Sequence, residues 1–499
     1  MAERETRTER EVKLAPPPGF ELADLSALVG ADVRALPPAD LVATYFDTHD
    51  LVLARSGITI RHRTGEGAPT WTVKLPAGEH AGALVRREID IEGDRARRPR
   101  ELAATVMAHL RGRRLGPVAE VRSQRDRALI EDGAGQALVE VVHDHVTAVR
   151  GRRLLGSWEE VEVEAMDAPG ALDAQRRVVR ALRKAGSAKA PAVPKLVRAL
   201  GDEAAAAPDL IVPELPAHPK VIDALELAIA RSVVQILEHD PAVRVGGDPE
   251  DLHQLRVATR RLRSDLRTFR GFLDADVSAR VRDELRWVAD QTNELRDLDV
   301  LRAWLVAKTA ALPDDDRPAM EELIGRCDEQ AAARRAVLLR ALGSPRYGAL
   351  VHDLVHLLET PPAVDQKQER RARKRLDRQV RRRWHELEAL MGALGDDHDD
   401  ADLHQARIAA KRCRAAVEAV IPLVGRDARR LARALAKLQD VLGAVHDASV
   451  TEAWLRQVRA TPAAFAAGEL AVLARIDGRV SGERWPDVWA KVERRHAAM

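Results

Sequence analysis

The chain contains few aromatic residues and few cysteines. Phe, Trp and Tyr together make up 3% of the 499 residues, whereas proteins that bind single-stranded nucleic acids usually stack bases on aromatic side chains. We therefore expect no nucleic acid partner. The two cysteines, Cys327 and Cys413, have no pairing motif, and we interpret them as packed thiols in a reducing compartment.

Long apolar runs are also missing. No window of the sequence approaches the roughly 20 apolar residues that a membrane-spanning helix needs. Residues 1–13 are rich in charged side chains, unlike the apolar core of a secretory signal. We therefore expect a cytoplasmic protein without a membrane partner.

Neither sign of charge is in large excess. The formal net charge is only +2, although 32% of the residues are charged. Bulk charge therefore predicts no polyanionic partner, and any such partner must be inferred from local clusters of charge. The length and the 45% of apolar residues are sufficient for more than one domain with its own core.

The composition changes near residue 203. Before it, short segments alternate charged and apolar residues with a period of two, which is typical of strands with one polar face. These segments are 58–63, 71–75, 87–92, 137–142 and 159–164. An alanine- and proline-rich stretch at 204–217 is interpreted as a linker, and helical periodicity follows it. We predict a two-domain α+β protein, with a strand domain at 1–203 and an all-α domain at 218–499.

The helical part contains an internal repeat. The segment that begins at His253 matches the one that begins at His404, and the surroundings of Asp297 match those of Asp447. The two offsets are 151 and 150 residues, so the register is kept. This repeat predicts two similar helical bundles related by pseudo-symmetry.

Several predicted strands carry charges on one face, because alternate residues of a strand share a face. The residues concerned are Glu9, Glu11 and Lys13, then Arg61 and Arg63, and finally Glu160, Glu162 and Glu164. One such strand would normally be a solvated polar face. Acidic strands at both ends of the segment, with basic strands between them, instead suit a closed barrel with a polar lumen. Carboxylates bind hard divalent cations, and arginine and lysine bind phosphate oxygens.

The first domain resembles the CYTH family, the triphosphate tunnel metalloenzymes, over roughly residues 3–203. The matching segments, in family order, are Glu9-x-Glu11-x-Lys13, Tyr45-Phe46-Asp47-Thr48, Ile60-Arg61-His62-Arg63, Trp71-Thr-Val-Lys74-Leu-Pro, Arg87-Glu88, Arg122-Ser-Gln-Arg125, Glu160-Val-Glu162-Val-Glu164 and Lys195. The resemblance implies an eight-stranded antiparallel barrel that forms a tunnel. It also implies cleavage of triphosphates with Mg²⁺ or Mn²⁺.

The same resemblance assigns roles to residues. Glu9, Glu11 and Lys13 would be catalytic. The metal ligands would be Glu9, Glu11, Asp144, Glu162 and Glu164, with Glu160 as the alternative to one of the last two, because three alternating glutamates leave the register open. The triphosphate would be bound by Lys13, Arg61, Arg63, Lys74, Arg125 and Lys195. An inorganic triphosphatase that acts on tripolyphosphate is the preferred interpretation, and a class IV adenylate cyclase, which uses the same tunnel, is the alternative enzyme.

Each copy of the helical repeat has a narrow cationic stripe. Residues that fall within about an 80° arc of one helix face form each stripe. The first stripe contains His253, Arg256, Arg260 and Arg263, and the second contains His404, Arg407, Lys411 and Arg414. An ordinary solvated face mixes both signs of charge for pairing along the helix, whereas these stripes are cationic and occur twice. They therefore indicate a surface that binds anions.

The helical domain resembles the CHAD family, the conserved-histidine α-helical domains, over about residues 218–499. The matching residues are His253-x-x-Arg256-x-x-x-Arg260-Arg261-x-Arg263, Leu295-Arg296-Asp297-x-Asp299, His404-x-x-Arg407-x-x-x-Lys411-Arg412 and Leu438-Gln439-Asp440-Val-Leu442-Gly443. Such domains bind inorganic polyphosphate through a basic central groove, which would contain both stripes. The resemblance therefore adds polyphosphate as a partner and association with polyphosphate granules. A non-catalytic protein that targets polyphosphate is the alternative to an enzyme.

Overall fold

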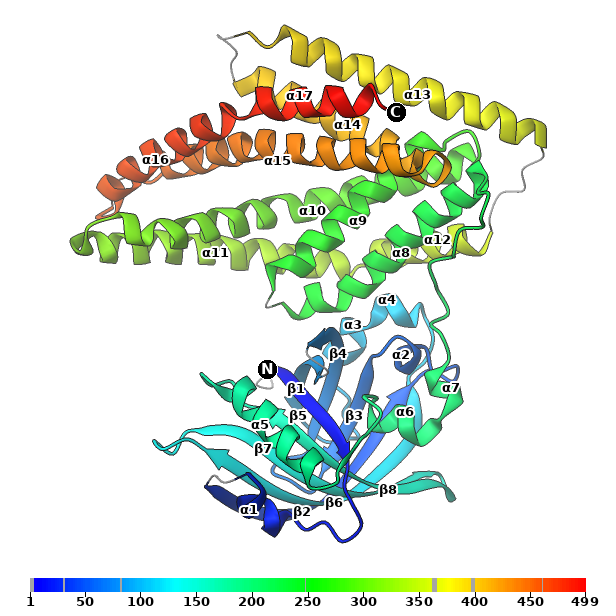
Figure 1. Cartoon of the computed structure of the whole chain (residues 1–499), viewed down its shortest axis with the longest axis vertical. Helices are drawn as coiled ribbons and strands as arrows, with labels where there is room; N and C mark the ends of the chain where they lie inside the picture. The colour runs from blue at the N-terminus through cyan, green and yellow to red at the C-terminus, as the bar shows by residue number, and fades with distance from the viewer. Residues whose placement is uncertain are drawn as a thin grey trace. The chain divides into compact units, whose positions relative to one another are not determined.

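The computed structural model describes residues 4–29, 32–80, 83–246, 248–360, 366–395, 400–459 and 461–499. The chain divides into two compact units, Met1–Asp209 and Leu210–Met499 (Figure 1), here called the barrel unit and the helical unit. The division falls within the stretch at 204–217 that was interpreted as a linker. That stretch begins inside a helix, α7 (Asp202–Ala205), and Ala204 is buried in the barrel unit.

Eight strands of the barrel unit close into an antiparallel barrel, as predicted. Around the barrel the order is β1-β5-β4-β3-β2-β6-β7-β8, and β8 pairs with β1 again. The strands are β1 (Arg4–Ala15), β2 (Val33–Asp47), β3 (Thr59–Thr64), β4 (Thr70–His80), β5 (Ala83–Glu92), β6 (Gly116–Glu131), β7 (Ala137–Arg150) and β8 (Arg153–Ala165). The two-residue strand β9 (Ala188–Lys189) is added beside the end of β1. Strand β1 closes the barrel by pairing with β5 over Arg4–Glu11 and with β8 over Glu11–Leu14.

The alternation of side chains separates a charged lumen from an apolar outer face. On β8, Val161 and Val163 point outward and pack against Val178 and Leu182 of helix α5 (Ala171–Lys184). Figure 1 shows α5 against the outside of the barrel. Glu160, Glu162 and Glu164 alternate with these two valines and therefore face the lumen.

Short helices complete the barrel unit. They are α1 (Leu25–Val29), α2 (Val52–Arg55), α3 (Arg100–Thr105), α4 (Met107–Leu110) and α6 (Lys195–Leu200). Leu196 and Leu200 of α6 pack on Val121 and Ala148, so this helix covers an apolar part of the barrel. Asp47 accepts hydrogen bonds from the backbone N–H groups of Leu53 and Ala54, at 3.0 and 2.8 Å. It therefore holds the first turn of α2 and has a structural role.

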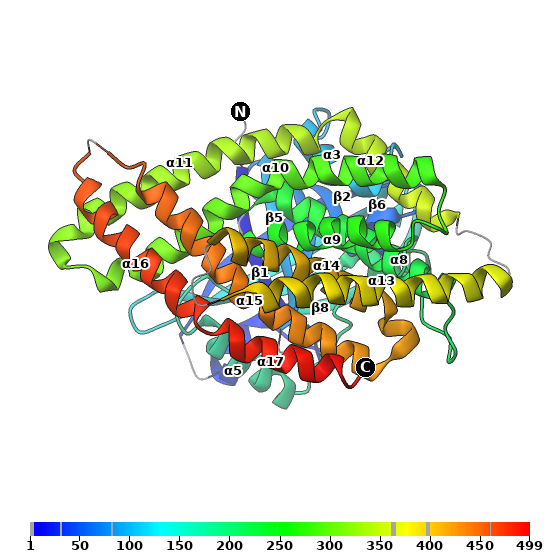
Figure 2. The same cartoon turned by 90° about the horizontal axis from the view of Figure 1, so that it is seen from above.

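The helical unit consists of two runs of antiparallel helices, as the repeat predicts. The helices are α8 (Val221–Val245), α9 (Pro249–Thr268), α10 (Ala275–Lys308), α11 (Arg317–Leu342), α12 (Pro345–Glu359), α13 (Gln366–Ala393), α14 (Asp400–Val424), α15 (Arg426–Leu455), α16 (Ala464–Gly482) and α17 (Trp485–His496). Helices α8 to α11 pack in sequence order, and so do α13 to α16. Helices α9 and α14, which begin the two copies of the repeat, lie side by side (Figure 2).

Helix α9 shows why the cationic stripe lies on an accessible face. Asp248 caps its N-terminus by accepting a hydrogen bond from the backbone N–H of Glu250 at 2.8 Å, and Pro249 follows the cap. Leu255, Leu262 and Leu266 are fully buried on one side of the helix. The arginines of the repeat are therefore left on the other side.

Two expectations from composition can be compared with the structure. Cys327 and Cys413 are free and buried, and burial raises the pKa of their thiols to about 11 and about 12, as expected for packed thiols. Across the residues that the structure describes, no helix combines the length and the apolar character needed to cross a membrane.

Candidate functional site

The lumen of the barrel contains a cavity of about 140 Å³ that is lined almost entirely by charged side chains. Nine of the lining residues are basic and seven are acidic. Half of these charged residues are buried, and buried charges must be paired or must bind ions. A cavity of this composition therefore suits an anionic ligand together with metal cations.

The structure brings together the residues that the sequence predicted for the barrel site. Those that line the cavity are Glu9, Glu11, Lys13, Arg61, Arg63, Lys74, Arg125, Glu162, Glu164 and Lys195. Asp144 lies directly behind this lining, where its carboxylate is 2.9 Å from the Nζ atom of Lys195. The predicted roles of these residues remain predictions.

Three buried carboxylates form the first acidic cluster, made of Asp144, Glu160 and Glu162. Their oxygen atoms all lie within 4.8 Å of one another, since Asp144 and Glu160 are direct neighbours across β7 and β8. Lys195 reaches both glutamates at 2.7 Å. Although burial opposes ionisation, Lys13 and Lys195 hold the pKa of Glu162 well below its usual range. Glu160, the alternative ligand, thus belongs to this cluster.

A second acidic group contains Glu9, Glu11 and Glu164. One guanidinium nitrogen of Arg86 lies 3.1 Å from Glu9 and 2.6 Å from Glu11. Burial raises the pKa of Glu11. Glu164 is the cross-strand neighbour of Glu11 and forms no ion pair within the described part of the chain. Burial and the nearby Glu9 raise the pKa of Glu164 to about 8.

These carboxylates fit a hard divalent cation. Glu9 is already paired with Arg86 and Lys74, whereas the adjacent Glu164 has no ion-pair partner among the described residues and is protonated near neutral pH. A divalent cation bound by oxygen ligands at this place would favour the ionised form of Glu164. The donor set contains oxygen atoms only, which favours Mg²⁺ or Mn²⁺ over softer metals.

Among the described basic residues that line the lumen, Arg61 and Arg63 on β3 have the longest ion-pair distances. Each lies 3.7 Å from its nearest carboxylate, Glu88 for Arg61 and Glu66 for Arg63. Repulsion by Arg61, together with burial, lowers the pKa of Arg63 to about 10. Arg125 differs, because its guanidinium binds both oxygens of Asp144 at 2.8 and 2.7 Å. Arg61 and Arg63 are therefore the guanidinium groups best placed to bind an added phosphate.

In the helical unit, the two cationic stripes meet between α9 and α14. Burial and the neighbouring Arg407 and Arg414 lower the pKa of Arg260. Burial, Arg407 and Arg260 also lower the pKa of Lys411, to about 8. Within the described part of the chain, Arg260, Arg407 and Lys411 form no salt bridge. Cations that are crowded in this way favour a bound anion.

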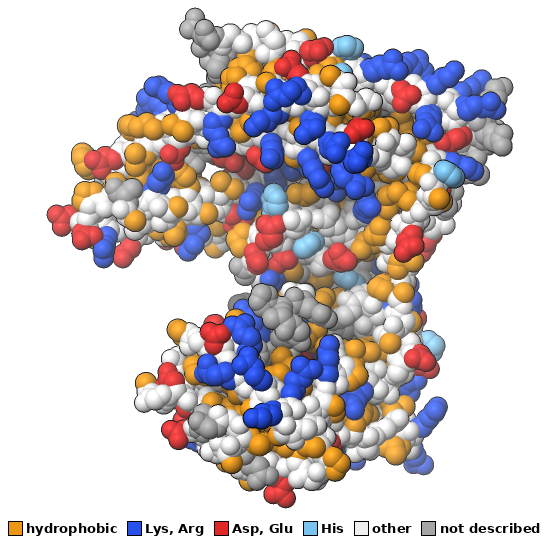
Figure 3. Space-filling view, in the orientation of Figure 1, with side chains coloured by type: hydrophobic (Ala, Val, Ile, Leu, Met, Phe, Trp, Pro, Cys, Tyr) orange, Lys and Arg blue, Asp and Glu red, His pale blue; other side chains and the backbone are white. Residues whose placement is uncertain are grey.

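The remaining members of the stripes have different surroundings. Arg256 donates hydrogen bonds to the neutral oxygens of Thr292 and Asn293 at 2.9 and 2.8 Å. Arg414 is paired with Glu418 at 2.8 Å. Burial and the nearby Arg286 lower the pKa of Arg263, although Asp290 opposes this shift. The ring of His404 lies 5.1 Å from that of His446. Figure 3 shows many lysine and arginine side chains on one face of the helical unit.

Comparison with protein families agrees with both halves of this description. The family model of the CYTH domain matches residues 7–196, and that of the CHAD domain matches residues 227–456. A relative that is 33% identical over 419 residues, covering 80% of this chain and 78% of its own length, is the uncharacterized protein Rv2226 of Mycobacterium tuberculosis. The chain is a CYTH–CHAD protein. CYTH domains are metal-dependent and bind triphosphates, and CHAD domains are linked to polyphosphate.

Solved structures also resemble the two domains. The CHAD domain from the plant Ricinus communis is 27% identical, covers 57% of this chain and 95% of its own, and has a TM-score of 0.46. A putative adenylyl cyclase from Hippeastrum, HpAC1, described as having a dominant triphosphatase activity, is 18% identical. It covers 38% of this chain and 94% of its own, with a TM-score of 0.25.

Sequence analysis gave no role to six charged residues that line the CYTH lumen, of which Arg86 and Glu88 are the most buried. Glu88 was named only as part of the family-like segment Arg87-Glu88, and adjacent residues of a strand point to opposite faces. Arg86 therefore shares the lumen face with Glu88, which is fully buried and pairs with Lys74 and Arg7. The alternation Arg86-x-Glu88 is the signal that could have identified both.

Proposed function

We propose that the CYTH domain hydrolyses tripolyphosphate with Mg²⁺ or Mn²⁺, and that the CHAD domain binds inorganic polyphosphate. The first part is supported by one observation above the others. A single closed lumen holds two groups of carboxylates next to Arg61 and Arg63, whose nearest carboxylates are 3.7 Å away. The second part is supported by the unpaired cations where α9 meets α14.

The residues of the lumen can perform the parts of a phosphoryl transfer to water. This reaction depends on positioning and on charge stabilisation more than on covalent chemistry. Arg61, Arg63 and Lys74 would bind and orient the phosphates. When bound by Glu9, Glu11 and the neighbouring carboxylates, the metal supplies charge neutralisation at the phosphate oxygens.

Lys13 would act as a fixed cation. Burial opposes its charge, but Glu11 and Glu162 raise the pKa of its ammonium above the usual range. It therefore keeps its proton throughout the physiological pH range, which excludes a role as general base. Its place beside the carboxylates suits stabilisation of negative charge on the departing phosphate.

The lining of the lumen favours an inorganic triphosphate over a nucleotide. Of the described residues that line the cavity, Tyr45 alone is aromatic, and its hydroxyl group lies within reach of Arg61. A cyclase would need a surface for the purine ring. The lining instead offers nine basic side chains, which can bind phosphate oxygens.

The test is phosphate release from tripolyphosphate, ATP and thiamine triphosphate, each measured with Mg²⁺ and with Mn²⁺. We expect tripolyphosphate to give the highest kcat/KM and to require a metal. Formation of cyclic AMP from ATP as the main reaction would favour the cyclase. The absence of any turnover would favour a targeting protein, in which the CHAD domain brings the chain to polyphosphate granules.

A further inference from the structure

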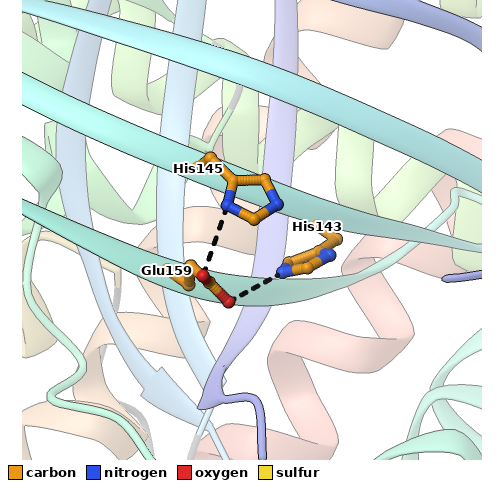
Figure 4. Close-up of side chains that lie close together, drawn as sticks. All are labelled: His143, His145 and Glu159. Atoms are coloured by element: carbon orange, nitrogen blue, oxygen red, sulfur yellow. Dashed lines mark ion pairs between the residues drawn. The ribbon is translucent and has the colours of Figure 1, made fainter. Parts of the chain in front are cut away.

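A second cluster of metal-binding residue types lies on the outer face of the barrel. His143 and His145 alternate on β7 and therefore share a face, and Glu159 of β8 is the direct cross-strand neighbour of His145. Figure 4 shows both imidazole rings directed toward the carboxylate of Glu159. This face is opposite to that of Asp144 and Glu160, so the cluster is separate from the lumen.

The distances in this cluster suit a small cation. Nε2 of His143 lies 3.5 Å from one carboxylate oxygen of Glu159, and Nδ1 of His145 lies 3.4 Å from the other. One ligand atom from each residue lies within 4.8 Å of the other two. In a tetrahedral zinc site, with bonds of ~2.0–2.1 Å, ligand atoms are about 3.3 Å apart. Small side-chain movements would therefore complete the geometry.

His143 provides independent support for a missing ligand. Its side chain is almost completely buried, with a relative exposure of 4%. Phe20 packs against it edge to face, with ring centroids 5.2 Å apart. Its Nε2 atom is buried and has no hydrogen-bond partner among the described residues, although it faces Glu159. A buried polar atom of this kind requires a partner, and a cation between the three side chains would be one.

We propose that His143, His145 and Glu159 form a binding site for a borderline divalent cation of the Zn²⁺ type. Two imidazole nitrogens and one carboxylate oxygen are ligands that zinc prefers, whereas Mg²⁺ and Ca²⁺ prefer oxygen ligands only. His145 and Glu159 are about half exposed, which leaves the fourth position open to water. Both residues also line an open groove of about 950 Å³, through which the cation can enter.

A cation bound at this site would also affect two carboxylates of the lumen. Asp144 lies between the two histidines in the sequence, and Glu160 directly follows Glu159, but both point inward. A cation that joins His143 and His145 to Glu159 would cross-link β7 and β8. It would thereby fix the spacing of Asp144 and Glu160 on the other face of the same two strands.

The test is calorimetric titration of the untagged full-length protein with Zn²⁺ in excess Mg²⁺, which occupies oxygen-only sites. His145→Ala and Glu159→Gln are the first variants, because both residues are partly exposed and their replacement should not disturb folding. We expect each variant to lose one equivalent of bound zinc, or to bind it more than tenfold more weakly. Titration with Co²⁺ should also give the visible absorption of a tetrahedral site in the unmodified protein and not in the variants.

Two controls make the result decisive. His352→Ala removes a well exposed histidine of the helical unit and should leave zinc binding unchanged. The lumen variant Glu9→Gln with Glu11→Gln should also retain the zinc equivalent. The proposal is overturned if His145→Ala and Glu159→Gln bind zinc as the unmodified protein does. It is equally overturned if the lumen variant alone loses the equivalent.

Discussion

The Nζ atom of Lys195 lies 2.7 Å from a carboxylate oxygen of Glu162, although Lys195 begins helix α6 and Glu162 lies on β8. The same ammonium also contacts Asp144 and Glu160. One helix outside the sheet thus supplies a cation that contacts three carboxylates of two strands. This contact joins the C-terminal end of the CYTH domain to its lumen.

Replacing Glu9 and Glu11 together by glutamine should abolish tripolyphosphate hydrolysis. Glutamine keeps the shape of the side chain but removes the negative charges that would hold the metal. Phosphate release should fall to background, while circular dichroism shows an intact fold. Glu203→Gln, at an exposed glutamate of α7, is the control and should be fully active. Normal turnover in the double variant would contradict the assignment of these residues.

Replacing Arg61 and Arg63 by alanine should lower kcat/KM for tripolyphosphate by well over tenfold. Hydrogen bonds to charged groups contribute about 1.5–3 kcal/mol each, and neither arginine has a close carboxylate that would be left unpaired. The matched control is alanine at Arg34 and Arg122, two more exposed strand arginines. Equal kinetics in both double variants would show that Arg61 and Arg63 do not contact the substrate.

Charge reversal in either stripe of the CHAD domain should weaken the binding of long-chain polyphosphate. The variants are Arg256→Glu with Arg260→Glu, and Arg407→Glu with Lys411→Glu. Because the two stripes meet between α9 and α14, both variants should act on one site. Binding should also weaken steeply with salt and with shorter chains. Fluorescence anisotropy with labelled polyphosphate measures each effect.

The control for this experiment is Arg317→Glu with Arg479→Glu, which reverses two exposed charges elsewhere in the helical unit. We expect this variant to bind polyphosphate almost as well as the unmodified protein. An equal loss in all three variants would mean that binding follows overall charge and that no groove exists.

Polyphosphate affinity should decrease as the pH rises from 7 to 9. Burial and the adjacent Arg407 and Arg260 lower the pKa of Lys411 to about 8, so its ammonium is charged below this pH and loses its proton above it. Lys411→Arg keeps the charge at all these pH values, so most of the pH dependence should disappear. An identical pH profile in the variant would assign the effect to another group.

The sequence was sufficient for the barrel and for most of the lumen, because strand alternation fixes which residues share a face. Glu9 and Glu11 could be placed together in this way, and the repeat placed His253 and His404 on equivalent helices. The sequence could not show which carboxylates cluster, since that depends on the register between strands. Asp144 is beside Glu160 only because β7 and β8 pair as they do. For the same reason, the sequence could not show that His143 and His145 lie beside Glu159.

The double pairing of β1 has a consequence for the order of assembly. This strand, at the start of the chain, pairs with β8, which ends at Ala165. During synthesis its second half therefore has no partner until almost the whole domain has left the ribosome, and such distant contacts form slowly. Glu11 and Lys13 meet Glu164 and Glu162 at this closing seam. The carboxylates of β1 and β8 therefore come together in the same step that removes the last free strand edges, and Lys195 of helix α6 joins them only when a later part of the chain has been made.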